Sequence, residues 1–195
     1  MLRTIPQTRD SAWVYRLAMI SVFAALTAIG ARVTVEIGPV PLTLQTLAVF
    51  LAGMVLGSRD GALSQVLYVG LIIGGLPLDA RALGPAVFAG PTWGYLIGFI
   101  PCAYVAGYLT ERANGRMWMR VIAGLTGSVF VFGLGFIVLK YNLDLTWQAA
   151  FISGVWEFQV ENVAKALLAA GISESARALL LRTLLPPLDG SLGDR

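Results

Sequence analysis

A lysine inside an apolar stretch near the end of the chain is the residue whose charge most needs a partner. Lys165 follows Glu161 at i+4 and Asn162 at i+3, and Glu157 lies one turn earlier, so these side chains share or adjoin one helical face. In lipid, an ammonium group is costly and is rarely kept without a function. Mutual neutralisation of Glu161 and Lys165 is the simpler interpretation, but we favour a polar site that faces the interior of a helix bundle, near its outer surface.

Arg81 is a second cation that could contact a ligand. It is the only cation in residues 74–85, a loop rich in glycine and proline. A guanidinium group binds a carboxylate through two parallel hydrogen bonds, which an ammonium group cannot do. The loop alone does not distinguish a ligand-binding arginine from an exposed one. Together, however, Arg81 and Lys165 on the same outer side indicate an anionic small-molecule ligand.

Uncharged polar and aromatic side chains provide further candidates for this site. Thr43 and Gln45 follow two prolines at the start of the second apolar segment. We expect Thr43 to cap a helix, and the Gln45 amide can both donate to and accept from an amide or ureido group. The alternative, in which Gln45 bonds the backbone of another helix, stays open. Tyr68, Trp93 and Tyr95 are candidates for an apolar wall, although aromatic residues in spans more often serve packing.

The composition indicates an integral membrane protein. Hydrophobic residues make up 57% of the 195 residues, charged residues make up 13%, and the mean hydropathy is +0.75. A soluble domain carries roughly a quarter charged residues, so this chain cannot cover a water-facing surface. We therefore expect the lipid bilayer as its environment, and the net charge of +3 gives no reason to expect nucleic acid as a partner.

The apolar runs are separated by glycine, proline and charge clusters, and they predict one all-α domain with six membrane-spanning helices. Residues 145–154 are too short to span and predict an interfacial or re-entrant helix, with Trp147 and Trp156 at headgroup depth. Near the end of the last span, Glu174 and Arg177 are spaced to pair at i, i+3, or the helix leaves the membrane there. The predicted spans cover residues 16–34, 41–58, 61–78, 92–110, 119–139 and 157–181.

The distribution of basic residues predicts the orientation of these spans. Six spans place both termini on the same side of the membrane. Ten of the fourteen Lys and Arg residues lie on that side, three lie on the other, and Lys165 lies within a span. The positive-inside rule then places both termini in the cytoplasm.

Several classes of chemistry are disfavoured by the residues that the chain contains. There is no histidine, and Cys102 is the single cysteine, so we expect neither a metal site nor a cofactor. The glycine-rich segments lack the Lys-Ser/Thr ending of a nucleotide-binding loop, so any coupling to ATP must come from another chain. An intramembrane enzyme that uses Glu157 or Glu161 as acid or base would lack a nucleophile or metal. A purely structural subunit would leave Lys165 and Arg81 without a use.

Four sequence blocks occur in a characteristic order: Gly38-Pro39-Val40-Pro41-Leu42-Thr43-Leu44-Gln45-Thr46, residues 51–64, Gly75-Leu76-Pro77 and residues 90–99. Together with the alanine-rich first span and the lysine-bearing last span, these blocks are distributed over most of the length of the chain. In these blocks the chain resembles the BioY family, the biotin-specific S components of energy-coupling factor (ECF) transporters.

The resemblance implies a six-helix subunit of the bacterial cytoplasmic membrane that binds biotin from outside with high affinity. It would dock on a transmembrane T component and two ATPases, and homo-oligomers stay open. Lys165 and Arg81 occupy the positions of the lysine and the loop arginine that help form the family's biotin site. The family's acidic residue three positions before the lysine is Asn162 here, which can bond the ureido ring without charge.

The same resemblance suggests a docking face and an alternative ligand. Ala24 and Ala28 have the small-xxx-small spacing that lets another helix approach closely, and they would contact the T component. The alternative is an S component for another anionic vitamin. A cationic vitamin such as thiamin is disfavoured by Lys165 and Arg81.

Overall fold

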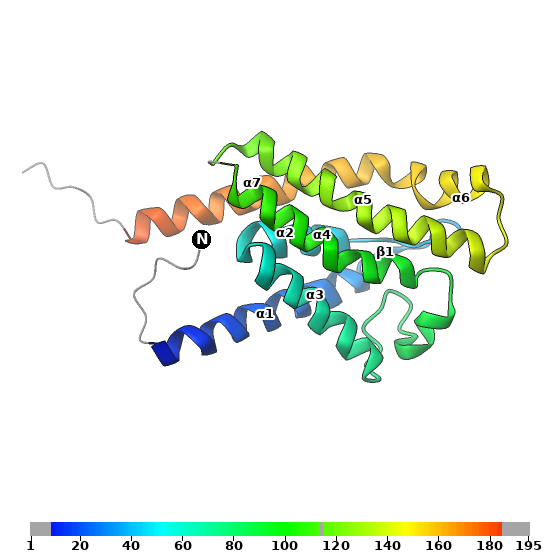
Figure 1. The fold of residues 1–195 in the computed structure, drawn as a ribbon, viewed down its shortest axis with the longest axis horizontal. Helices are drawn as coiled ribbons and strands as arrows, with labels where there is room; N and C mark the ends of the chain where they lie inside the picture. The colour runs from blue at the N-terminus through cyan, green and yellow to red at the C-terminus, as the bar shows by residue number, and fades with distance from the viewer. Residues whose placement is uncertain (1–8, 114, 185–195) are drawn as a thin grey trace, which may run out of the picture.

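Helices make up most of the computed structural model, which describes the backbone of residues 9–113 and 115–184 and the side chains of residues 13–113 and 115–176. Figure 1 shows the long helices running roughly along one axis as a bundle. The helices of 12 residues or more are α1 (Arg9–Arg32), α2 (Gln45–Leu56), α3 (Ser58–Ile73), α4 (Trp93–Glu111), α5 (Met117–Asn142) and α7 (Gln159–Leu184).

Short elements connect these helices. Strands β1 (Thr34–Val35) and β2 (Leu42–Thr43) pair antiparallel as a small hairpin between α1 and α2. A 3₁₀ helix, η2 (Gly84–Ala89), lies between α3 and α4. The short helix α6 (Trp147–Gly154) and the 3₁₀ helix η3 (Trp156–Phe158) lie between α5 and α7.

The predicted order of helices is confirmed, including the short helix before the last long one, but α2 and α3 are shorter than the spans predicted for them and α1 begins before residue 16. The second helix begins at Gln45 rather than residue 41, because Leu42 and Thr43 are extended and pair with β1 as strand β2. The third ends at Ile73 rather than residue 78, where Gly74 and Gly75 begin the following loop.

Among the described residues, two helices meet a length and hydropathy criterion for crossing a membrane: residues 13–32 of α1, with a mean hydropathy of 1.7, and α5, with 2.2. Helix α2 has 12 residues and is therefore about 18 Å long, well below the roughly 30 Å of a bilayer core. Six complete spans therefore remain a prediction, whereas the helical architecture is confirmed.

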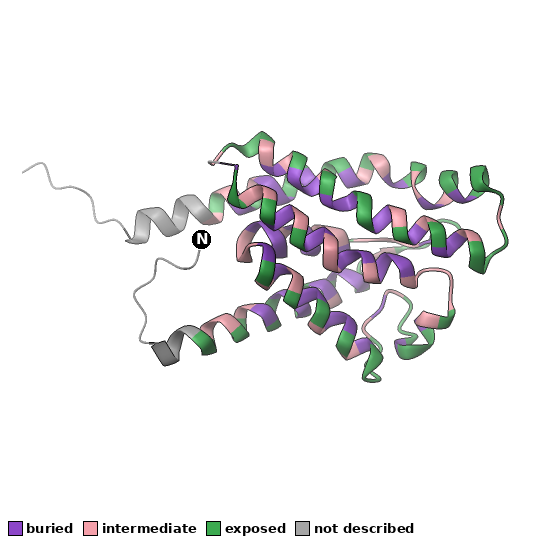
Figure 2. Ribbon diagram, viewed as in Figure 1, coloured by how far each residue is buried: buried purple, intermediate pink, exposed green. Residues whose placement is uncertain are grey.

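The helices at the centre of the bundle approach one another closely through glycine. Helix α4 packs against α2, α3 and α5. A Cβ atom added to Gly107 of α4 would lie 2.5 Å from the backbone nitrogen of Ser58, and one added to Gly61 of α3 would lie 2.8 Å from the Ala52 carbonyl oxygen. Figure 2 shows buried residues along the inner faces of the helices and exposed residues on the outside.

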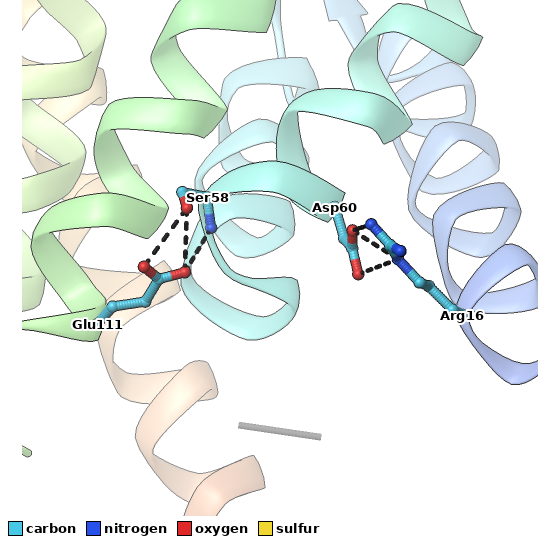
Figure 3. A network of polar contacts seen from close by, with 4 residues as sticks. All are labelled: Arg16, Ser58, Asp60 and Glu111. Carbon is cyan, nitrogen blue, oxygen red and sulfur yellow. Dashed lines mark hydrogen bonds and ion pairs between the residues drawn. The ribbon is translucent and has the colours of Figure 1, made fainter. Parts of the chain in front are cut away.

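Charged groups join three helices where α2 turns into α3. The Glu111 carboxylate, at the end of α4, accepts a hydrogen bond from the Ser58 backbone N–H at 2.8 Å and another from the Ser58 hydroxyl at 3.1 Å (Figure 3). This carboxylate satisfies a free backbone N–H at the start of α3, and its negative charge interacts favourably with the positive end of the α3 helix dipole. Nearby, Arg16 of α1 donates from Nε to both carboxylate oxygens of Asp60, at 2.8 and 2.9 Å.

Packing contacts of α1 and α7 bear on two of the sequence-based expectations. Ala24 is 2% exposed, and Ala28 packs against the core, so α2 and α3 already cover this face of α1. Docking of a T component there stays a prediction and would require these packing contacts to open. Glu174 pairs at 2.9 Å with Arg120 of α5, and the predicted pairing of Glu174 with Arg177 involves a side chain outside the described part.

The start of α1 and the end of α7 lie at one end of the bundle, at the left in Figure 1. The β1–β2 hairpin, the loop between α3 and α4, and α6 gather at the opposite end. Segments that are far apart in the sequence therefore meet at this second end, where they can form a site.

The close crossing at Gly107 predicts a large effect of one methyl group. Gly107→Ala should lower the thermal unfolding temperature in detergent, because the added Cβ meets backbone atoms that cannot rotate away. The matched control is Gly70→Ala in α3, where an added Cβ meets nothing within 4 Å. That change should raise stability by roughly 0.5–1 kcal/mol. Equal melting temperatures for the two variants would contradict the tight crossing.

Candidate functional site

A pocket lies where the hairpin, the α3–α4 loop and η3 meet. Its empty volume, including the part open to solvent, is about 650 Å³. The wall is largely apolar with a few polar side chains, as such sites usually are. The lining residues are Val40, Pro41, Thr43, Gln45, Thr46, Asp79, Ala80, Arg81, Leu83, Val87, Thr92, Tyr95, Leu96, Phe99, Val131, Phe132, Phe158 and Glu161.

A buried carboxylate shapes the loop that presents Arg81. Asp79 is 2% exposed; its Oδ1 accepts from the Gly84 backbone N–H at 2.7 Å, and its Oδ2 accepts from the Arg81 N–H at 3.1 Å. Asp commonly bonds its own backbone two residues on, and this fixes a turn. Between Arg81 and Gly84, Ala82 adopts a left-handed backbone conformation with φ 57°. The loop therefore holds Arg81 at the pocket in a defined position.

The Arg81 guanidinium is paired with a carboxylate from the hairpin. Its Nη2 lies 2.8 Å from Glu36 Oε2, and it also donates to the Pro39 carbonyl at 3.2 Å. The hydrogen bond from Arg81 lowers the pKa of Glu36, and the same bond raises the pKa of Arg81. Both groups therefore stay charged at neutral pH, and the pair connects the hairpin to the α3–α4 loop.

Lys165 lies behind the pocket wall rather than in it. It is 5% exposed, its Nζ lies 2.9 Å from Glu161 Oε2, and it donates a hydrogen bond to the Thr43 carbonyl. Both of these partners line the pocket, whereas Lys165 does not. The predicted i, i+4 proximity to Glu161 is therefore present. Lys165 and Arg81 each have a carboxylate partner of their own and do not share one.

A chain of hydrogen bonds links Thr43 to the α3–α4 loop. The Thr43 hydroxyl donates to Gln45 Oε1 at 3.0 Å, and Gln45 Nε2 donates to the Tyr68 hydroxyl at 2.7 Å. Tyr68 in turn donates to the Leu78 carbonyl at 3.1 Å. Gln45 thus bonds a side chain of α3 rather than a helix backbone. Tyr68 positions the polar groups and is not part of the pocket wall.

The expected helix cap at Thr43 is wrong by one residue. The N-cap of α2 is Leu44, which makes no side-chain cap bond. The Thr43 hydroxyl still accepts from the Gln45 backbone N–H at 3.3 Å, so it satisfies one free donor at the start of the helix.

Asn162 carries an unused hydrogen-bond acceptor. The residue is 2% exposed, and its Nδ2 donates to the Ser128 hydroxyl of α5 at 2.9 Å. Its Oδ1 is buried and has no hydrogen-bond partner among the described residues. An unsatisfied buried acceptor costs about 1–3 kcal/mol. Asn162 does not line the pocket, so a ligand N–H would reach this oxygen only after neighbouring side chains move.

Aromatic rings form much of the pocket wall. Tyr95 lines it, and the Tyr95 hydroxyl donates to the Gly154 carbonyl at 2.9 Å, which attaches α4 to α6. Phe132 and Phe158 face each other with ring centroids 6.2 Å apart. Trp93 does not line the pocket.

Sequence reasoning missed the roles of Glu36, Asp79, Phe132 and Phe158. Asp79 had a local signal, because it precedes Arg81 by two residues in a turn-rich loop. The other three had none, since they reach the site from other elements. Within residues 9–113 and 115–184, no group of three His, Cys, Asp or Glu side chains is placed to hold a metal ion.

Comparison with known proteins gives a consistent result. The family model described as the BioY family matches residues 5–182. The chain is 35% identical to the "Probable biotin transporter BioY" of Lysinibacillus sphaericus over 179 residues, which cover 85% of this chain and 91% of the relative. It is 37% identical to the "Biotin transporter BioY" of Thermotoga maritima over 158 residues, covering 79% of this chain and 93% of that protein.

A solved structure has the same fold. The crystal structure of the S-component for biotin from an ECF-type ABC transporter superimposes with a TM-score of 0.80 and 26% sequence identity, covering 89% of this chain and 95% of the other. The family match spans all the helices that form the pocket. On these grounds the chain belongs to the BioY family.

Proposed function

We propose that this chain is a membrane transporter subunit that captures biotin for uptake, and not an enzyme. The observation that carries the proposal is the apolar pocket, with Arg81 at its loop side and hydrogen-bonding groups of α2 and α7 on its other side. This pocket occurs in a chain of the BioY family whose relatives are named biotin transporters. Biotin has matching parts: a carboxylate, an apolar chain and ring, and a ureido group.

The burial of the polar groups suggests how biotin is oriented. Arg81 is partly exposed, whereas Asn162 is almost fully buried. Burying an ionised carboxylate without full compensation is far more costly than burying a neutral ureido group. The carboxylate would therefore bind Arg81, and the ureido ring would reach the interior. There its N–H groups could donate to Glu161, which lines the pocket, and to Asn162 Oδ1 once neighbouring side chains move, while Lys165 stays behind the wall and holds Glu161 in place.

The finer assignments follow from the family context. The similar structure comes from an ECF-type ABC transporter, which supports a T component and two ATPases as partners that supply the energy. The location of the α1 start and the α7 end at one end of the bundle supports an even number of crossings. With ten of fourteen Lys and Arg residues on that side, we propose a multi-pass protein of the bacterial cytoplasmic membrane with both termini inside.

Binding of biotin to the purified protein tests this function and both cations. Arg81→Ala should weaken binding by about tenfold or more, the range for a lost hydrogen bond to a charged group. Lys165→Ala should also weaken biotin binding, because Glu161 then loses its cation beside the ligand.

Lys140→Ala is the matched control: Lys140 stacks on Tyr141 and Trp147, outside the pocket, and its loss should leave affinity unchanged. No saturable binding by the folded wild type would refute the function. Unchanged affinity in both variants would refute the site.

The free Asn162 oxygen predicts a second effect on affinity. Asn162→Ala should weaken biotin binding by about tenfold, because the ureido N–H loses a buried acceptor. Asn162→Asp keeps an acceptor at this position and should retain binding. The control is Asn142→Ala at the end of α5, where the side chain bonds only its own helix at the Val138 carbonyl. Equal affinity in Asn162→Ala and Asn142→Ala would show that the oxygen does not contact biotin.

A further inference from the structure

The edge of the Arg81 guanidinium that carries Nε and Nη2, a pair of donors suited to a carboxylate, is already occupied by a carboxylate of the same chain. Its Nε donates to Glu36 Oε1 at 3.2 Å, and its Nη2 donates to Glu36 Oε2 at 2.8 Å. Two parallel N–H donors of this kind are what an arginine uses to bind a carboxylate bidentately. A ligand carboxylate therefore cannot use this edge while Glu36 stays in place.

We infer that Glu36 is a specificity-determining residue, which occupies Arg81 until a ligand carboxylate displaces it. The inference rests on the proposed function, in which Arg81 receives the carboxylate of biotin. Glu36 is tethered next to Arg81, so its effective concentration is far higher than that of a free anion. A simple carboxylic acid is thereby excluded. Only a carboxylate whose remaining atoms also fill the apolar pocket gains enough to replace Glu36.

The exposure of the two ion pairs indicates that the exchange occurs at Arg81. The side chains of Arg81 and Glu36 are 33% and 53% exposed, so Glu36 can return to water when it is displaced. Exposed ion pairs contribute little net stability. The Lys165 side chain is only 6% exposed and is also held by the Thr43 carbonyl. Breaking its pair with Glu161 would leave a charge in an apolar environment.

The hairpin can stay attached during the exchange. Nη2 of Arg81 also donates to the Pro39 carbonyl at 3.2 Å, and a terminal guanidinium nitrogen has two hydrogens. The bond to Pro39 can therefore persist when the bond to Glu36 is replaced. Val40 and Pro41, which follow directly, line the pocket and would keep their positions. The exchange then changes the partner of Arg81 without removing a wall of the site.

Biotin and its uncharged amide, biotinamide, separate this role from a general effect on the pocket. In Glu36→Gln, the dissociation constant for biotin should fall by about two- to fivefold, the range given by the usual strength of exposed ion pairs. The dissociation constant for biotinamide should not change, because it has no charge to exchange with Glu36. Glu157→Gln, which removes another exposed carboxylate near Phe158, should change neither value.

A double variant locates the effect on Arg81. In an Arg81→Gln background, Glu36→Gln should no longer tighten biotin binding, because the group for which both carboxylates compete is absent. Biotin affinity that is unchanged or weaker in Glu36→Gln, or equal tightening of biotin and biotinamide, would overturn the inference. So would a persistent gain in the double variant. Absence of saturable biotin binding by the wild type would refute the proposed function itself, and with it this role of Glu36.

Discussion

The need to neutralise charge in an apolar bundle is the constraint on which the rest of the site depends. Lys165 is almost fully buried, and it is tolerated because Glu161 and the Thr43 carbonyl compensate its charge. The Thr43 bond also fixes the end of the hairpin against α7. A single buried ammonium group thus brings together the last helix, the hairpin and the start of α2.

From Thr43, the hydrogen-bond chain continues through Gln45 and Tyr68 to the loop that carries Arg81. A buried polar network of this kind requires each member to be satisfied, and it then specifies one arrangement. The short helices α2 and α3 contribute to the same result, because their glycine contacts hold them rigidly against α4. The pocket is therefore held between elements whose relative positions are fixed on both sides.

Much of the fold follows from the sequence, because glycine, proline and charge separate the apolar runs clearly. The helix order and the presence of the short helix α6 could be predicted from these signals. The late start of α2 could not be predicted, since proline is compatible with the first turn of a helix and it is the pairing of Leu42 and Thr43 with β1 that delays the helix. The partner of Arg81 could not, because Glu36 is 45 residues away in the sequence and the hairpin brings it close. Phe132 and Phe158 also lacked a signal, as apolar residues among many others.

Lys165 illustrates the limit for the site. Its anomalous charge identified the helix and the neighbourhood of the pocket, but its side chain lies behind the wall and acts through Glu161 and Thr43. Asn162 was a candidate through the family resemblance, and the structure adds that its oxygen is buried without a hydrogen-bond partner among the described residues. The sequence reveals which polar groups lie in apolar segments, whereas the three-dimensional contacts decide which of their atoms remain free to form hydrogen bonds with a ligand.

A structure of the protein with bound biotin tests the central claim most directly. We expect ligand density in the pocket between the hairpin, the α3–α4 loop and η3, with the carboxylate about 3 Å from the Arg81 guanidinium and the ureido ring toward Asn162. Biotin bound at another place on the bundle, or in this pocket with its carboxylate away from Arg81, would contradict the proposed site.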